Sequence, residues 1–321
     1  MANAKEIRSR MEAVRETQKI TNAMYLISSA KLRKAKKDLE DTQPYFNGIK
    51  GEIKRLFRMI KNVESRYFYP EDESKKLNGT YGYLIITADK GLAGAYNQNV
   101  LKEASRLLEE HKDAKIYVVG EYGRQYLMSH HIPIERSFLY TAQNPTLQRA
   151  REIAAVLLEQ FDNGNIQKLF IIYTDYGKGM ELQASSARLL PLHRAQFHVA
   201  ENEKEILHPF EFVPSVKEVL ENIVPGYVEG FIFSALIDSF CCEQSARMSA
   251  MDAANRNAEK MIQSMKLEYN HIRQGAITRE ITEVCAGARY QKRKRQEKRQ
   301  EKRREQAAGK AVEETAGAGS R

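Results

Sequence analysis

The sequence contains no tryptophan and only three cysteines in 321 residues. Cys241 and Cys242 are adjacent and Cys285 stands alone, so the spacing supports neither a disulfide framework nor a metal site. No apolar run approaches the roughly 20 residues that span a bilayer, and the N-terminus lacks the apolar core of a secretory signal. These absences exclude a disulfide-stapled secreted domain and predict a reduced, cytoplasmic setting.

Proline and glycine are missing from both ends of the chain. All eight prolines lie between Pro44 and Pro225, and residues 1–43 contain neither proline nor glycine. Residues 231–274 also lack both. Because proline breaks helices and glycine weakens them, the sequence predicts a long helix at each end, the second over about 231–289.

Apolar and small residues recur at steps of three and four in both predicted helices, which is the pattern of two stripes that face each other. The N-terminal stripe is predicted to be Ala13, Thr17, Ile20, Met24 and Ile27, continued by Leu32, Ala35 and Leu39. The C-terminal stripe is predicted to be Ala254, Ala258, Met261, Met265, Tyr269, Ile272 and Ala276, followed by Ile277, Ile281 and Val284. At 1.5 Å per residue the second helix is on the order of 90 Å long. A coiled coil follows in which the C-terminal helix protrudes.

The middle of the chain alternates short apolar runs with helical periodicity. Buried strands are predicted at 81–87, 116–119 and 169–173, with helices at 99–111 and 146–161. This alternation predicts a small parallel sheet covered by helices. The fold class is therefore α+β, a long two-helix coiled coil with an inserted Rossmann-like α/β domain. The predicted segments are an N-terminal coil helix 1–60, the α/β domain 61–205, a C-terminal coil helix 206–290 and a charged, partly disordered tail 291–321.

The tail carries most of the net charge of +9. Nine basic and three acidic residues lie between Lys292 and Glu305, so +6 is concentrated there. Glu297, Glu301 and Glu305 follow one another at steps of four among these basic residues. This interleaving of charges favours a solvated, self-supporting helix over a nucleic-acid site. The final dozen residues are predicted to be disordered.

The segment Asp89–Asn97 (DKGLAGAYN) follows a predicted strand and precedes a helix, where glycines could admit a phosphate. Gly91 and Gly94 match neither dinucleotide-binding nor P-loop spacing, so a tight structural turn is the favoured interpretation over nucleotide binding. GxSxG, HExxH and CxxC are all absent. We therefore predict a non-catalytic protein with no cofactor and no metal.

Three separated blocks of sequence resemble the gamma subunit of F-type ATP synthases, over about residues 1–290. The first is Thr17–Met24 (TQKITNAM) with Ser29–Lys34 (SAKLRK), and the second is Asp89–Asn97. The third and most specific runs from Ala246–Met251 (ARMSAM) to Ile277–Glu283 (ITREITE). The resemblance predicts a bacterial member of this family.

The resemblance implies a central rotor shaft with an antiparallel coiled coil. The implied partners are three alpha and three beta subunits, the epsilon subunit and the membrane c-ring, on the cytoplasmic face of the cell membrane. The ATP-handling residues would belong to beta. The residues implied to contact beta are Arg273, Gln274, Thr278, Glu280 and, on the other helix, Met24.

Two departures from the family pattern stand out. Gly275 replaces the usual alanine and would loosen the helix by about 1 kcal/mol. The basic tail after Tyr290 is unlike the family; it would emerge at the top of the alpha/beta ring and is predicted to be dispensable for rotation. Two rival interpretations remain: a coiled-coil scaffold or nucleic-acid-binding protein led by the tail, and a nucleotide-binding α/β domain.

Overall fold

The computed structural model describes residues 4–59, 65–69, 79–139, 141–176, 183–193, 197, 213 and 215–317. The chain divides into two compact units. One unit is residues 20–255, and the other combines residues 1–19 with residues 256–321. Two helices, α1 (Ala4–Met59) and α5 (Val216–Gly317), contribute to both units, which are described separately below.

A five-stranded sheet forms the centre of the unit 20–255, with strand order β3-β2-β1-β4-β5. The strands are β1 (Tyr81–Ile86), β2 (Lys115–Val119), β3 (Arg136–Phe138), β4 (Lys168–Thr174) and β5 (Ala184–Leu190). The first four run parallel, and β5 is antiparallel to β4. The helices between them are α2 (Tyr96–Glu110), α3 (Glu121–Ser129) and α4 (Leu147–Asp162). The predicted α/β domain is confirmed, with the antiparallel edge strand β5 as an addition.

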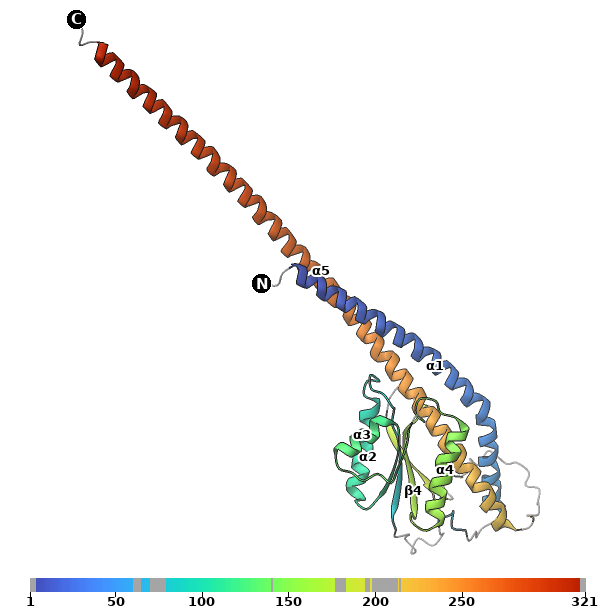
Figure 1. The fold of residues 1–321 in the computed structure, drawn as a ribbon. Helices are drawn as coiled ribbons and strands as arrows, with labels where there is room; N and C mark the ends of the chain where they lie inside the picture. The colour runs from blue at the N-terminus through green and yellow to red at the C-terminus, as the bar shows by residue number, and fades with distance from the viewer. Residues whose placement is uncertain are drawn as a thin grey trace. The chain divides into compact units, whose positions relative to one another are not determined.

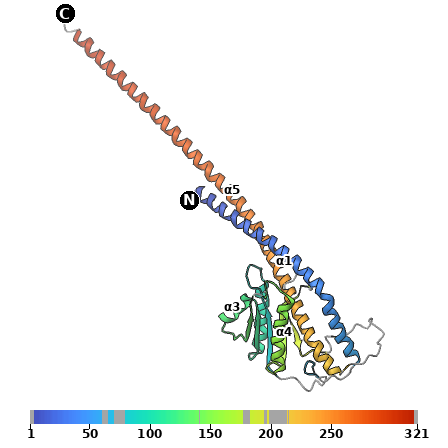
Figure 2. The same cartoon turned by 45° about the vertical axis from the view of Figure 1, so that its right-hand side comes forward.

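Alternate residues of the strands face two different cores, as the two-residue period of a strand requires. Figures 1 and 2 show α2 and α3 on one side of the sheet and α4 with α5 on the other. Tyr83 and Ile85 belong to the core under α2 and α3. Leu84 and Ile86 belong to the larger core, which α4, α5 and α1 complete. Burial on both faces explains why β1 is a continuous apolar run.

The inward-facing seam of α1 in this unit follows alternating steps of four and three, a strict seven-residue repeat. The buried and half-buried residues of the seam are Thr21, Tyr25, Ser28, Leu32, Ala35, Leu39, Thr42, Phe46, Ile49, Ile53 and Leu56. A repeat of this kind produces left-handed coiled-coil packing. The prediction for Leu32, Ala35 and Leu39 is therefore confirmed.

The predicted stripe through Ile20 and Ile27 was wrong. Ile20 is 62% exposed and Ile27 is 56% exposed, so this stripe is an outer face of α1. Only Met24, between them, is half-buried. The error arose because the true seam carries polar residues such as Thr21 and Ser28, while the outer face carries isoleucines.

Helix α5 is surrounded on all sides in the middle of the unit. Between Val228 and Arg247 it has no exposed residue. By length and composition alone, α5 also contains one stretch apolar enough to cross a membrane, which the sequence analysis did not allow for. Of that stretch, 56% is buried inside the structure, as in the core helix of a soluble protein. Packing within the unit therefore accounts for its apolar character.

Two prolines lie inside the long helices. Pro44 is within α1 and Pro225 is within α5. A helical proline leaves the carbonyl four residues earlier without its usual N–H partner. For Pro44 that carbonyl belongs to Glu40, which is exposed and therefore accessible to water. Helix α5 consequently begins at Val216, before the expected start near residue 231, whereas α1 ends at Met59, close to the predicted boundary at residue 60.

The other unit combines the start of α1 with the distal part of α5. Ile7 and Met11 are buried on α1, and Ala258 and Ile262 are buried on α5. Met261, which was predicted to lie on the stripe, is 54% exposed, so Ile262 takes the inward position. From Ala276 to Gln300 every described residue is exposed. Helix α5 continues to Gly317.

Candidate functional site

The four predicted contact residues of α5 lie in the unit of residues 1–19 and 256–321, and all four are exposed. The Thr278 hydroxyl donates to the carbonyl of Gln274 at 2.9 Å, so it satisfies its own helix. Within the described part of the chain, Arg273 and Glu280 form no ion pair. A guanidinium and a carboxylate are therefore presented to solvent here, free to bind a partner.

An apolar stripe on the same part of α5 is uncovered. Ile277, Ile281 and Val284 follow at steps of four and three and are 47%, 57% and 68% exposed. Burying these three β-branched side chains against a partner would remove apolar surface from water, which is favourable in free energy. Together with Arg273 and Gln274 they make this segment a candidate interface for another protein.

Met24 lies in the unit 20–255, at the edge of a hollow of about 250 Å³. Ile27 from α1 and Leu92 from the turn before α2 line the same hollow and are largely exposed. Lys31 and Lys90 also line it, and both are exposed. The hollow therefore combines apolar side chains with two ammonium groups and the carboxylate of Asp89.

A buried ion pair forms the floor of this hollow. Arg247 Nη1 lies 2.6 Å from Glu243 Oε1, and the two side chains are only 10% and 9% exposed. Arg247 Nη2 also donates to the carbonyl oxygens of Gly91 at 3.1 Å and Lys90 at 3.4 Å. Burial raises the pKa of the Glu243 carboxyl, and the nearby Arg247 opposes that rise without cancelling it. The pair fastens the turn before α2 to α5.

The turn itself uses its polar groups to hold the fold together. The Glu121 amide donates to Asp89 Oδ1 at 2.9 Å, and the Ala88 amide donates to Asn97 Oδ1 at 2.9 Å. Leu92 and Gly94 both have positive φ angles, 61° and 55°, which bend the chain sharply. These bonds favour the structural interpretation of Asp89–Asn97 over phosphate binding. The Glu243–Arg247 pair did not stand out in the sequence, because opposite charges four residues apart are common on solvated helices.

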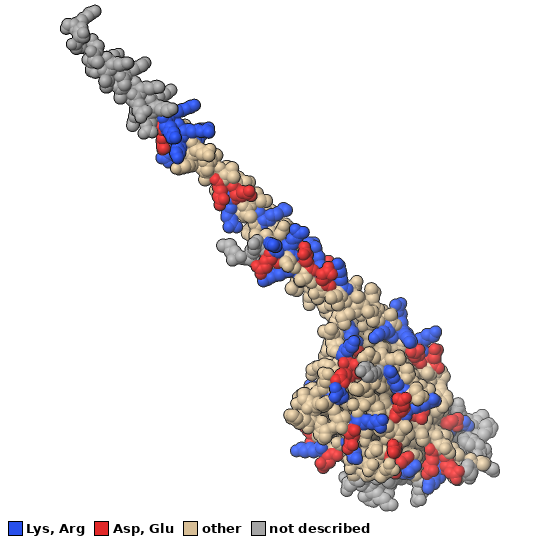
Figure 3. Space-filling model, in the orientation of Figure 1, with Lys and Arg blue, Asp and Glu red and all other residues tan. Residues whose placement is uncertain are grey.

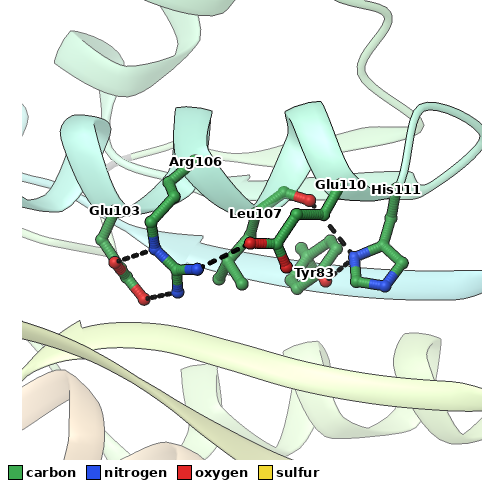
Figure 4. A network of polar contacts seen from close by, with 6 residues as sticks. All are labelled: Tyr83, Glu103, Arg106, Leu107, Glu110 and His111. Atoms are coloured by element: carbon green, nitrogen blue, oxygen red, sulfur yellow. Dashed lines mark hydrogen bonds and ion pairs between the residues drawn. The ribbon is translucent and has the colours of Figure 1, made fainter.

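A second polar network lies at the end of α2 (Figure 4). Arg106 bridges Glu103 and Glu110, each at 2.8 Å. The Tyr83 hydroxyl lies 2.8 Å from His111 Nδ1, and burial raises the pKa of Tyr83. The Tyr83–His111 contact joins β1 to the end of α2, while the two Arg106 ion pairs lie within α2 itself.

Thiol and metal chemistry find no support in the described residues. Among them, no group of three or more His, Cys, Asp or Glu side chains could hold a metal ion. Cys241 and Cys242 are buried, and burial raises the pKa of each thiol to about 12. Cys285 is exposed. The fold therefore defines a class of protein in which two long helices, at the two ends of the chain, flank an α/β domain in the sequence.

Comparison with known proteins specifies that class. The ATP synthase family model matches residues 3–289. The ATP synthase gamma chain of Caldanaerobacter subterraneus subsp. tengcongensis is 40% identical over 292 residues, covering 88% of this chain and 98% of the relative. The chain therefore belongs to the ATP synthase gamma chain family.

Solved structures share the fold. A chain of the Tetrahymena thermophila mitochondrial ATP synthase central stalk and c-ring structure has a TM-score of 0.56 and 24% identity, covering 73% of this chain and 99% of that one. A chain of the Euglena gracilis mitochondrial ATP synthase OSCP/F1/c-ring structure has a TM-score of 0.60 and 17% identity, covering 88% and 92%. The predicted fold class is thereby confirmed.

Proposed function

We propose that this chain is the central rotor shaft of a bacterial F-type ATP synthase. It couples ion flow through the membrane sector to ATP synthesis and hydrolysis at the beta subunits. The observation that carries this proposal is 40% identity with a gamma chain across 98% of that relative's length. The chain itself is non-catalytic and requires no cofactor.

The proposed partners are three alpha and three beta subunits, the epsilon subunit and the c-ring. The chain is peripheral to the cell membrane through this complex, on the cytoplasmic face. A shaft with different side chains on each face biases the three beta subunits differently. The nucleotide affinity of each beta subunit is then linked to the rotational angle of the shaft, because both depend on the same set of conformational states of the complex.

Two surfaces are proposed to contact beta subunits. The first is Arg273, Gln274, Thr278 and Glu280 on α5, where exposed hydrogen-bonding groups adjoin an exposed apolar stripe. The second is the hollow beside Met24. The ammonium groups of Lys31 and Lys90 at this hollow favour an acidic beta segment, since opposite charges steer association and set its specificity.

Reconstitution with the alpha and beta subunits tests the proposal. We expect one copy of the chain per ring and ATP hydrolysis that depends on it. A chain that remains outside the ring and binds polyanions in a salt-dependent manner would instead be a scaffold or nucleic-acid-binding protein. Direct ATP binding by the isolated chain would favour the enzyme alternative.

A further inference from the structure

The turn between β1 and α2, residues 87–95, is buried at its base and exposed at its tip. At the base, Ala93 belongs to a buried apolar cluster that includes Cys242 of α5. At the tip, Lys90 is exposed and the Leu92 side chain is 66% exposed. Apolar packing therefore holds the base of the turn, while the tip depends on other contacts.

The backbone of the tip has a conformation that needs a restraint. Leu92 has a φ of 61°, in the left-handed region that a leucine rarely adopts. A residue keeps such a conformation only where the surrounding contacts hold it there. Among the described residues, Arg247 is the only group that hydrogen-bonds to the carbonyl oxygens of Lys90 and Gly91, at 3.4 and 3.1 Å. The Arg247 guanidinium is therefore the restraint on the tip.

A guanidinium suits this position because its donors point in two directions. Arg247 Nη1 lies 2.6 Å from Glu243 Oε1, while Nη2 donates to the two carbonyl oxygens of the turn. The planar group makes both sets of bonds at once, whereas a lysine offers a single ammonium group. The two side chains of the pair are only 10% and 9% exposed, so water competes little for these bonds.

The tip of the turn forms part of the hollow beside Met24. Lys90 and Leu92 both line it, together with Lys31 of α1. On the face of the unit 20–255 drawn in Figure 3, Lys and Arg are interspersed with Asp and Glu. Because charge does not single out one area of this face, selection of an acidic partner depends on where individual ammonium groups are held.

We propose that Arg247 is a positioning residue for the beta contact, which holds the tip of the turn so that Lys90 is presented at the hollow. The inference rests on the proposed function, because it requires that the hollow contact a beta subunit. Arg247 is itself buried, so it acts through the turn.

Trypsin cleavage after Lys90, followed by mass spectrometry on the isolated full chain, measures how firmly the tip is held. A protease cleaves a segment that can leave its folded conformation, so a restrained turn is cleaved slowly. Glu243→Gln/Arg247→Gln removes the restraint, leaves no buried charge unpaired and keeps the net charge unchanged. We expect cleavage after Lys90 to become about tenfold faster, the effect of losing the hydrogen bonds from a charged group to the turn.

Two further variants sharpen this measurement. Glu103→Gln/Arg106→Gln removes an ion pair of the same two residue types from α2 and should leave cleavage after Lys90 unchanged. Arg247→Lys keeps a positive charge beside Glu243 but loses the fork, so it should fold like the wild type and still accelerate cleavage. Cleavage at the wild-type rate in both Arg247 variants would overturn the positioning role.

A double-mutant cycle in the assembled complex determines whether Arg247 acts through Lys90. Lys90→Gln and Glu243→Gln/Arg247→Gln should each lower ATP hydrolysis about threefold, the effect of one exposed charge. The combined variant should lose no more than either, because an ammonium group that is already misplaced contributes nothing further. A combined loss of about ninefold, the product of the two, would show independent action and overturn the proposal.

Failure of the inference and failure of the proposed function give different results. Lost turnover in Lys90→Gln without faster cleavage in the Arg247 variants overturns only the positioning role. Full turnover in every variant of an assembled complex would show that the hollow does not contact beta, and it would overturn the positioning role together with that contact. A chain that does not assemble with the alpha and beta subunits overturns the proposed function and this inference with it.

Discussion

Phe46 on α1 lies against Gly230 on α5 so closely that a Cβ at position 230 would stand 2.0 Å from Cδ1 of the ring. Real Cβ contacts do not occur at this distance, so the Phe46 ring or one of the two helices would have to shift. Val228 and Ile232, on either side along α5, are fully buried. The close approach of the two helices therefore depends on the absence of a side chain at this one position.

The variant Gly230→Ala should destabilise the chain. Overpacking costs roughly 1–3 kcal/mol, while alanine regains about 1 kcal/mol of helix propensity. We expect a net loss of up to about 2 kcal/mol in the free energy of unfolding, measured by urea titration. The matched control is Gly226→Ala, one turn earlier, where the nearest atom is Ile49 Cδ1 at an ordinary 3.5 Å. A control as unstable as Gly230→Ala would contradict the packing argument.

Stability should fall as pH rises towards neutrality because of Asp238. Burial, and then the charge of Asp175, raise the pKa of its carboxyl from 3.8 to about 7. Above pH 4 the unfolded chain releases this proton while the folded chain retains it, so stability decreases up to about pH 7 and then levels off. Lys50, Tyr173 and Tyr227 line the same hollow as the two aspartates.

Asp238→Asn should remove that pH dependence. Because Asp238 is partly exposed, solvent screening makes the effect on stability smaller than the full pKa shift implies. We expect the variant to be more stable than the wild type by about 2 kcal/mol at pH 8 and similar to it near pH 4. Urea midpoints at the two pH values measure this difference. Asp113→Asn, in the exposed turn after α2, is the control and should change neither value. A wild-type chain whose stability rises from pH 5 to pH 7 would refute the assignment to Asp238.

Thiol labelling should separate the three cysteines. Burial holds the pKa of Cys241 and Cys242 at about 12, so neither forms appreciable thiolate at pH 8. Cys285 is exposed. The folded isolated chain should therefore react with one equivalent of a thiol reagent, counted by mass, and Cys285→Ser should react with none. Three equivalents in the folded wild type would show that the core of the unit 20–255 opens easily.

Much of the fold could be predicted from the sequence, because buried strands and helix faces carry apolar residues in a regular pattern. Strands β1 and β4 are buried on both faces and stand out as apolar runs. Strand β5 (ASSARLL) lies at the sheet edge, where small polar residues suffice, and it was missed. The seam of α1 was misplaced because Thr21 and Ser28 lie on it while Ile20 points outward.

The candidate site was only partly accessible to sequence reasoning. The resemblance supplied Arg273 and Met24; Arg273 is exposed and Met24 is half-buried, and their contacts with a partner stay predictions. The Arg247–Glu243 pair went unnoticed, since charges four residues apart are common on solvated helices. Only the tertiary structure shows that this pair is buried and that Arg247 binds the turn at Gly91. Partner contacts themselves depend on other chains, which one sequence does not encode.

Truncation of Met24 should slow ATP hydrolysis by the assembled complex without lowering the stability of the chain. Met24→Ala removes an apolar group from the hollow beside Lys31 and Lys90, so we expect about fivefold slower ATP hydrolysis by the assembled complex. The unfolding free energy should change little, because Met24 is only half-buried. Leu26→Ala, on the same helix but outside the hollow, is the control and should retain full turnover. Equal losses in the two variants would remove the hollow from the proposed contact.

The α5 contact makes the sharpest prediction. Arg273→Ala/Gln274→Ala removes two exposed hydrogen-bonding groups and should lower ATP hydrolysis by the assembled complex by roughly thirtyfold, since truncating a central interface residue commonly costs more than 1 kcal/mol. Assembly should be unaffected. The matched control Lys260→Ala/Gln263→Ala alters two exposed residues of the same unit and should leave turnover unchanged. If the first pair also retains full turnover while the chain still assembles, the rotor assignment stands and beta contacts α5 elsewhere, with Ile277, Ile281 and Val284 as the next residues to truncate.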